Sequence, residues 1–328
     1  MSRTMRHVVP MLCLSLLAGS ALADAPETPP EQVLVVGQKP GPGMWKVTRG
    51  DHVMWVFGSY GPLPKAMEWR SQQVEAVMAQ SQEFLTEPGA NYSVGILRGI
   101  TLLPFAIGAK NNPNGEKLRE VVPADTYERW LALKKKYIGE DSGIEKERPV
   151  FAAGALYDKA LRQSGLTRAV DLREQMLALA KKNKLKITSA TVTLDVDSPV
   201  KALREFKKQQ LADLPCFTRT IERLETDLDT VRLRANAWAK GDIDTIRKLG
   251  YQDQAADCSR AFMENTALQE HGFRDMENRI REKWIVAVET ALIANKSTVA
   301  MLPIKQILAE DGMFAALQAR GYKVEHPD

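Results

Sequence analysis

Glu87 is the acidic side chain best placed for chemistry, because it ends a short run, residues 83–87 (EFLTE), that is typical of a strand. Pro88 and Gly89 follow at once and stop this run. A carboxylate at the end of a strand can act as a general acid, as a general base or as a group that contacts a ligand. The alternative is a solvent-exposed acid before a turn, without a chemical role.

Lys305 and Gln306 form a second polar group, just after a strand expected over residues 298–302. If this strand and the strand at Glu87 end on the same side of one sheet, the three side chains lie close together. We therefore predict a polar patch there, with an ion pair between Glu87 and Lys305.

Histidine chemistry has little support. Beyond residue 23 the histidines are His52, His271 and His326, and no two of them have a metal-ligand spacing such as HxxxH. We expect each to be a surface residue and not a ligand or a base. The sequence also lacks the GxSxG, GxGxxG and Walker motifs, which argues against the enzyme classes that depend on them.

Two cysteines remain beyond residue 23, Cys216 and Cys258. An even count in an exported chain favours a disulfide. This bond would close a loop of about 40 residues and contribute roughly 4 kcal/mol in the chain-entropy model. The alternative is two separate buried thiols.

The elements that must position these residues are strands near both ends of the chain and helices between them. Residues 44–47 and 53–57 flank a Gly-Asp turn and predict a hairpin. Further elements are a helix over 65–80, a strand-like alternation over 186–194, a long amphipathic helix that Cys216 opens and Gly241 ends, a helix over 243–249 capped by Asp242, and a last strand over 322–325.

This order of elements predicts a helix-rich α+β fold. We expect a small central mixed β-sheet formed by the N- and C-terminal strands, with a long middle segment, about residues 110–295, that is mostly helical. The chain would consist of a signal peptide (1–23), a Pro/Gly-rich tail (24–43) and a single domain (44–328).

Residues 1–23 predict export. Arg3 and Arg6 precede a mostly apolar run, residues 8–17, and Ala21-Leu22-Ala23 supplies a small-x-small cleavage pattern, so that we expect cleavage after Ala23. The run is too short to span a bilayer, which needs about 20 residues. The mature chain would then be periplasmic or secreted, with no membrane span.

The charge of the mature chain is close to balanced. The formal charge of +4 includes two arginines and no acid among residues 1–23, which leaves about +2 after cleavage. We therefore expect no nucleic-acid partner.

Five stretches carry a resemblance to a known family: 44–47 (MWKV), 55–61 (WVFGSYG), 84–87 (FLTE), 165–171 (GLTRAVD) and 298–324, which ends in GYKV. Together they resemble the TraB/GumN (Tiki-like) family of exported proteins, over nearly the whole mature chain. In that family the second stretch is a strand ending in a G-x-x-H motif, and the third ends in a conserved acid. The last stretch holds a second G-x-x-H segment and a closing G-Y-x-V strand. The resemblance implies a TraB/GumN-like fold.

The family motifs imply a divalent-metal site used for hydrolysis, including peptide cleavage in the animal members, where the metal lowers the pKa of bound water to about 7. In this sequence Gly61 stands at the first histidine position and Gln306 at the second, with Pro303 where the second motif has glycine. Glycine offers no side-chain ligand, and neutral glutamine is a poor ligand for zinc-like ions. We therefore expect neither a metal nor another cofactor. The residues left as candidates for the altered cleft are Gly58, Tyr60, Gly61, Glu87, Lys305 and Gln306.

Three functions are compatible with this sequence. The missing histidines favour a non-catalytic envelope protein, a pseudo-hydrolase, that binds a peptide, a glycan or an envelope protein through the old cleft. The second possibility is a hydrolase of the peptidase kind with a displaced or metal-free site, built on Glu87 and Lys305. The third is an envelope structural or assembly factor, which would expose a large apolar patch on its helices, for instance around Trp130 or Trp238.

Overall fold

The computed structural model describes residues 42–327, apart from 66, 68, 70, 71, 93–101, 168, 169, 195, 197, 227 and 251–253. The expected signal peptide (1–23) and all but the last two residues of the expected tail (24–43) lie outside the described residues. The described residues belong to one compact unit.

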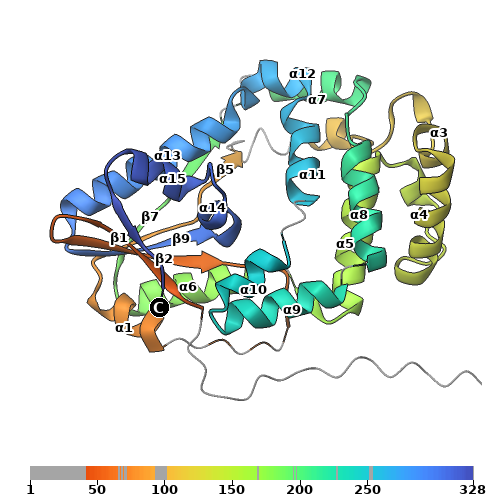
Figure 1. The fold of residues 1–328 in the computed structure, drawn as a ribbon. Coiled ribbons are helices and arrows are strands. Elements are labelled where there is room, and N and C mark those ends of the chain that lie inside the picture. The colour runs from red at the N-terminus through yellow and green to blue at the C-terminus, as the bar shows by residue number, and fades with distance from the viewer. Residues whose placement is uncertain are drawn as a thin grey trace, which may run out of the picture. The chain divides into compact units, whose positions relative to one another are not determined.

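Six strands form one mixed sheet, in the order β10-β1-β2-β9-β4-β7 (Figure 1). Their bounds are Met44–Arg49 (β1), His52–Ser59 (β2), Glu83–Leu85 (β4), Lys186–Thr188 (β7), Ser297–Pro303 (β9) and Lys323–Glu325 (β10). β1 pairs antiparallel with β2 and β10, whereas β2, β9, β4 and β7 run parallel to one another. The N- and C-terminal strands thus meet in one sheet, as the sequence predicts, and β7 joins them from the middle segment.

The centre of the sheet is buried on both faces. Four successive residues of β9, Val299, Ala300, Met301 and Leu302, are each at most 2% exposed, which is typical of a parallel strand with helices on both sides. Helix α13 (Met276–Ala294) packs on β2, β4 and β9, and α1 (Gln72–Gln80) contacts β9 and α6 (Val170–Lys182). Figure 1 shows α13 on one side of the sheet, with α1 and α6 on the other.

Most of the described residues between β5 (Gly89–Tyr92) and α13 are helical. The helices here, besides α6, include α3 (Leu118–Val121), α4 (Ala124–Tyr137), α5 (Pro149–Gln163), α7 (Pro199–Lys208), α8 (Leu214–Thr226), α9 (Leu228–Ala239), α10 (Ile243–Lys248), α11 (Gln254–Met263) and α12 (Thr266–Leu268). Two short helices, α14 (Ile304–Leu308) and α15 (Met313–Ala319), follow β9. Among the described residues, none of the helices has the length and the apolar character that crossing a bilayer requires.

The middle helices enclose a second hydrophobic core. α8 packs against α4, α5 and α11, around buried residues that include Trp130, Leu156 and Phe217. Trp130 is fully buried there, and Trp238 is 1% exposed in the core beneath the sheet. Neither tryptophan is therefore available to the apolar surface patch that the third function would need.

Three predicted elements differ from the structure. The strand expected over residues 186–194 is two strands, because β7 ends at Thr188 and β8 (Thr191–Leu194) pairs with β5 (Gly89–Tyr92) in a separate two-stranded sheet. The long helix after Cys216 is two helices, α8 and α9, and the helix expected over residues 65–80 is described as a helix from Gln72 onward. Apolar periodicity continues across the first two breaks because the residues on both sides face a core, so the pattern alone does not reveal them.

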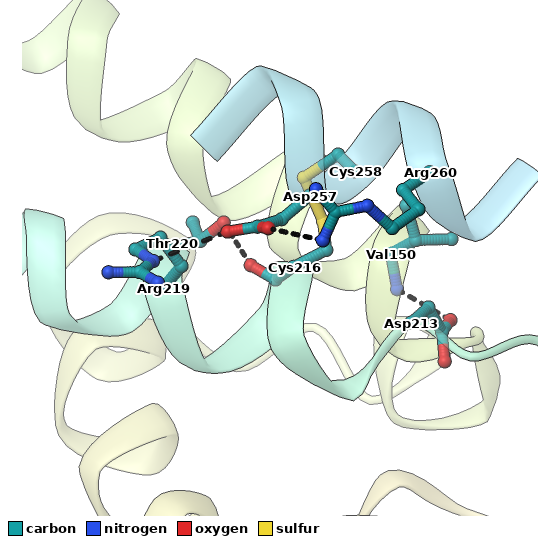
Figure 2. The surroundings of a disulfide bond; sticks show 8 residues. All are labelled: Val150, Asp213, Cys216, Arg219, Thr220, Asp257, Cys258 and Arg260. Atoms are coloured by element: carbon teal, nitrogen blue, oxygen red, sulfur yellow. Dashed lines mark hydrogen bonds and ion pairs between the residues drawn. A yellow bond between two sulfur atoms is a disulfide. The ribbon is translucent and has the colours of Figure 1, made fainter. Parts of the chain in front are cut away.

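The predicted disulfide between Cys216 and Cys258 is confirmed, and it joins α8 to α11 (Figure 2). The two Cα atoms lie 4.6 Å apart. Asp257 accepts a hydrogen bond from Arg219 on α8 at 3.3 Å, and one from Arg260 on its own helix at 3.4 Å. The covalent bond and this bridging carboxylate therefore fix the same pair of helices.

Candidate functional site

The candidate site lies at the carboxyl ends of three parallel strands, which is where open α/β sheets bind their ligands. Ser59, the last residue of β2, lies opposite Pro303, the last residue of β9. Leu85, the last residue of β4, lies opposite Ala300 of β9. Glu87 follows β4 by two residues, so it lies at the same edge as the residues after β9, as the sequence predicts.

Glu87 is buried at this edge, with a side chain only 8% exposed. Its Oε1 atom accepts a hydrogen bond from the hydroxyl of Ser59, and its Oε2 atom accepts one from Nε of Arg173. Ser59 is itself 5% exposed. The carboxylate is therefore not the exposed acid of the alternative interpretation, because each of its oxygens has a donor.

Arg173 is the functional candidate that the sequence analysis missed. It is the fourth residue of α6, its side chain is 54% exposed, and it forms an ion pair with Glu87. The one available signal was its place in the chain. The stretch 165–171 resembles the start of a family helix, and Arg173 follows it by two residues.

Lys305 and Gln306 lie in α14, which begins directly after β9, and both are half-buried. The described contacts pair Glu87 with another cation, Arg173, because α6 brings a long side chain to the same edge from the face of the sheet that α1 also covers. The ion pair between Glu87 and Lys305 stays a prediction.

Gly58 and Gly61 lie on either side of the end of β2 and have different reasons to be glycine. A Cβ atom on Gly58 would lie 2.6 Å from the ring of Trp45 and 3.3 Å from Ile307, so the core excludes a side chain there. The carbonyl of Gly58 accepts a hydrogen bond from the indole of Trp238 at 2.7 Å. Gly61 lies just after the strand, is half-buried, and brings no side chain to the edge.

Tyr60 points into the core and not toward a ligand. It is 2% exposed, and its ring stacks on Trp238 with centroids 6.5 Å apart. Burial raises the pKa of the Tyr60 hydroxyl, and the Arg234 side chain, which donates a hydrogen bond to this hydroxyl, partly offsets the effect. Tyr60 is therefore a packing residue next to the site.

The three histidines have partners in other parts of the fold. A ring nitrogen of His52, at the start of β2, contacts the carbonyl oxygen of Leu292. Nδ1 of His326 accepts a hydrogen bond from the indole of Trp45 at 3.3 Å, and Nε2 of His271 lies 2.8 Å from a carboxylate oxygen of Glu205. The side chain of His271 is 10% exposed, so this histidine lies closer to the interior than the surface position that we expected. None of these contacts involves the edge that holds Glu87.

A comparison with known families matches residues 43–326 to the TraB/PrgY/gumN family. The chain belongs to this family. The match covers both ends of the sheet and the helical middle segment between them. No curated protein and no solved structure matches the chain.

The divalent metal that the TraB/GumN resemblance implies does not fit the residues at this edge. Glu87 already accepts one donor at each oxygen, and one of these donors carries a full positive charge. A divalent cation on the same carboxylate would lie within a few ångströms of that guanidinium, and the two positive charges would repel each other. Within the part of the chain that the structure describes, no group of three or more His, Cys, Asp and Glu side chains could hold a metal ion.

Proposed function

We propose that this chain is an exported, non-catalytic binding member of the TraB/PrgY/gumN family, a pseudo-hydrolase of the cell envelope. Its site would bind a peptide, a glycan or an envelope protein at the carboxyl edge of the sheet. It would use neither a metal nor another cofactor.

The observation that carries this proposal is the pairing of Glu87 with Ser59 and Arg173. A hydrolytic metal site places a cation on its carboxylate and an activated water next to it. Here the positive charge beside the carboxylate is the guanidinium of Arg173, and a hydroxyl donates to the other oxygen. The positions of the two family histidines, held by Gly61 and Gln306, add neither an imidazole ligand nor a general base.

Export rests on the sequence of residues 1–23 and on the disulfide. A positive start, a short apolar run and a cleavage pattern after Ala23 are typical of a secretory signal. The bond between Cys216 and Cys258 is the kind that persists in an oxidising compartment such as the periplasm. The balanced charge of the mature chain gives nucleic acid no electrostatic advantage as a partner.

A hydrolase with a metal-free site is the second candidate, and one contact favours it. The hydroxyl of Ser59 donates to the carboxylate of Glu87, an arrangement that places a nucleophile beside a base. However, the same carboxylate is the counter-ion of Arg173.

Turnover assays separate the two candidates. The mature chain, starting at Asp24, would be incubated with peptide and oligosaccharide panels, with and without added manganese, cobalt or zinc. The binding proposal predicts no cleavage above that of buffer in any condition. Cleavage that is lost in Ser59→Ala would establish the metal-free hydrolase, and cleavage that requires added metal would establish a metal enzyme.

A further inference from the structure

The described contacts of the Arg173 guanidinium involve only one of its three nitrogens, Nε. Nε donates to Glu87, and no described contact uses the terminal nitrogens Nη1 and Nη2. Slightly more than half of the side chain is exposed, at 54%, whereas its carboxylate partner is 8% exposed. Among the residues that the structure describes, the two terminal nitrogens of Arg173 are therefore a pair of parallel N–H donors without a protein acceptor at the carboxyl edge of the sheet.

The buried residues Glu87 and Ser59 set the orientation of the Arg173 guanidinium. Ser59 donates to Glu87 from the end of β2, which fixes the carboxylate, and the carboxylate in turn holds Nε of Arg173. A guanidinium is planar and its donors lie in a fixed geometry, so holding Nε also sets the plane in which Nη1 and Nη2 point. Support of this kind by buried partners is what a recognition residue requires.

We propose that Arg173 recognises a carboxylate group of the ligand, in a bidentate pair with Nη1 and Nη2. The inference rests on the proposed binding function and names the chemistry that the site recognises. A guanidinium end matches a carboxylate with two parallel N–H···O bonds. Glu87 compensates part of the positive charge, so a singly charged carboxylate suits the site better than phosphate, which carries more negative charge than one shared guanidinium balances. The carboxylate could belong to a peptide or to an acidic sugar.

The competing explanation is that the pair only fixes α6 to the end of β4. Arg129 supplies a matched control, because its Nε and Nη2 also bind one carboxylate, that of Glu225, at 2.6–3.2 Å, and its side chain is 36% exposed. Arg173→Lys keeps the charge and can still pair with Glu87, but it lacks the two parallel N–H donors of the guanidinium. Arg129→Lys makes the same change on a surface that has no role in the proposal.

The test is an NMR titration of the isotope-labelled mature chain. It is followed at the backbone amide signals of Ser59 and Glu87, which every variant keeps, and at the Nε–H signal of Arg173, which Arg173→Lys assigns. The probes are N-acetylalanine and its neutral amide, glucuronate and glucose, and inorganic phosphate. We expect a carboxylate probe to shift these signals to saturation and the neutral partner of that probe to leave them unchanged. The probe that binds tells a peptide from a sugar. Arg173→Lys should weaken binding at least about tenfold, the cost of losing a charge-assisted hydrogen bond, and Arg129→Lys should not.

Equal binding by Arg173→Lys, or phosphate binding as tight as that of the carboxylates, would overturn the inference. So would the absence of any saturable shift on a folded chain that holds no metal and cleaves nothing. In these cases only the role of Arg173 fails. If the chain cleaves its probes or holds a metal, the proposed function fails instead.

Discussion

The Ser59 hydroxyl donates to the Glu87 carboxylate although their strands are not neighbours. Strand β9 lies between β2 and β4, so the hydrogen bond passes over the end of β9, where Pro303 leads into α14. The family motifs imply a metal at this edge. The contact joins Ser59, which follows the glycine of the first motif, to the family's acidic residue, Glu87. Arg173 completes the cluster from outside the sheet.

The first prediction concerns the coupling between Glu87 and Arg173. A double-mutant cycle with Glu87→Gln and Arg173→Met, measured by urea unfolding, should give a coupling free energy of about 1–2 kcal/mol, because one partner is buried. The same cycle on Arg129 and Glu225, whose side chains are 36% and 33% exposed, should give less than about 1 kcal/mol. Equal coupling free energies in the two pairs would show that the partly buried pair, Glu87 and Arg173, stabilises the fold no more than a surface pair does.

The second prediction concerns Gly58. Gly58→Ala should lower the free energy of unfolding by about 1–3 kcal/mol, because the added Cβ meets the ring of Trp45 at 2.6 Å. Gly154→Ala, in the helix α5, is the matched control. Its Cβ has no atom within 4 Å, so this variant should gain about 0.5–1 kcal/mol from helix propensity. Thermal and urea unfolding of both variants would check the pair, and a stable Gly58→Ala would refute the packing reason for this glycine.

The third prediction concerns the disulfide. Its cysteines are 42 residues apart, so its loss should cost about 4 kcal/mol in the chain-entropy model. Cys216→Ala/Cys258→Ala, compared with the oxidised chain in urea, measures this cost. The reduced wild-type chain controls for the substitutions, since it should lose a similar amount. An unchanged unfolding midpoint would mean that the contacts of α11 with α8 hold the helices without the bond.

The fourth prediction concerns Asp213, which is 5% exposed and accepts a hydrogen bond from the backbone N–H of Val150 at 2.9 Å. Burial raises the pKa of Asp213 above its ordinary value of 3.8, although this hydrogen bond and the charge of Arg148 act in the opposite direction. The folded chain thus binds this proton more tightly than the unfolded chain does. Stability from this group is therefore present at low pH and is lost as the pH rises through the raised pKa.

Asp213→Asn keeps an oxygen for Val150 and cannot ionise. Its free energy of unfolding should therefore improve relative to the wild type as the pH rises from the ordinary pKa of 3.8 through the raised pKa of Asp213, because only the wild type loses stability from this group. Urea unfolding at a series of pH values gives the difference directly. A difference that stays constant with pH would show that Asp213 does not titrate in this window.

Strand and helix order, the mixed sheet, the disulfide and the edge that holds Glu87 could all be predicted from the sequence. These depend on local patterns and on the rule that parallel strands end on the same side. The pairing of Glu87 with Arg173 could not be predicted, because it depends on how α6 packs, which no local pattern encodes. The contact of His271 with Glu205 was missed for a similar reason, since Glu205 lies on another helix, α7.

The metal content of the chain from Asp24 onward tests the central claim most directly. The chain, starting at Asp24, would be purified without chelators or a metal-binding tag, and its bound metal would be measured by mass spectrometry before and after addition of manganese, cobalt or zinc. If Arg173 serves as the counter-ion of Glu87, bound metal should stay far below one ion per chain, and Arg173→Met should not raise it, since the histidine ligands are absent. About one ion per wild-type chain, lost in Glu87→Ala, would contradict this and show that the family's metal site persists with other ligands.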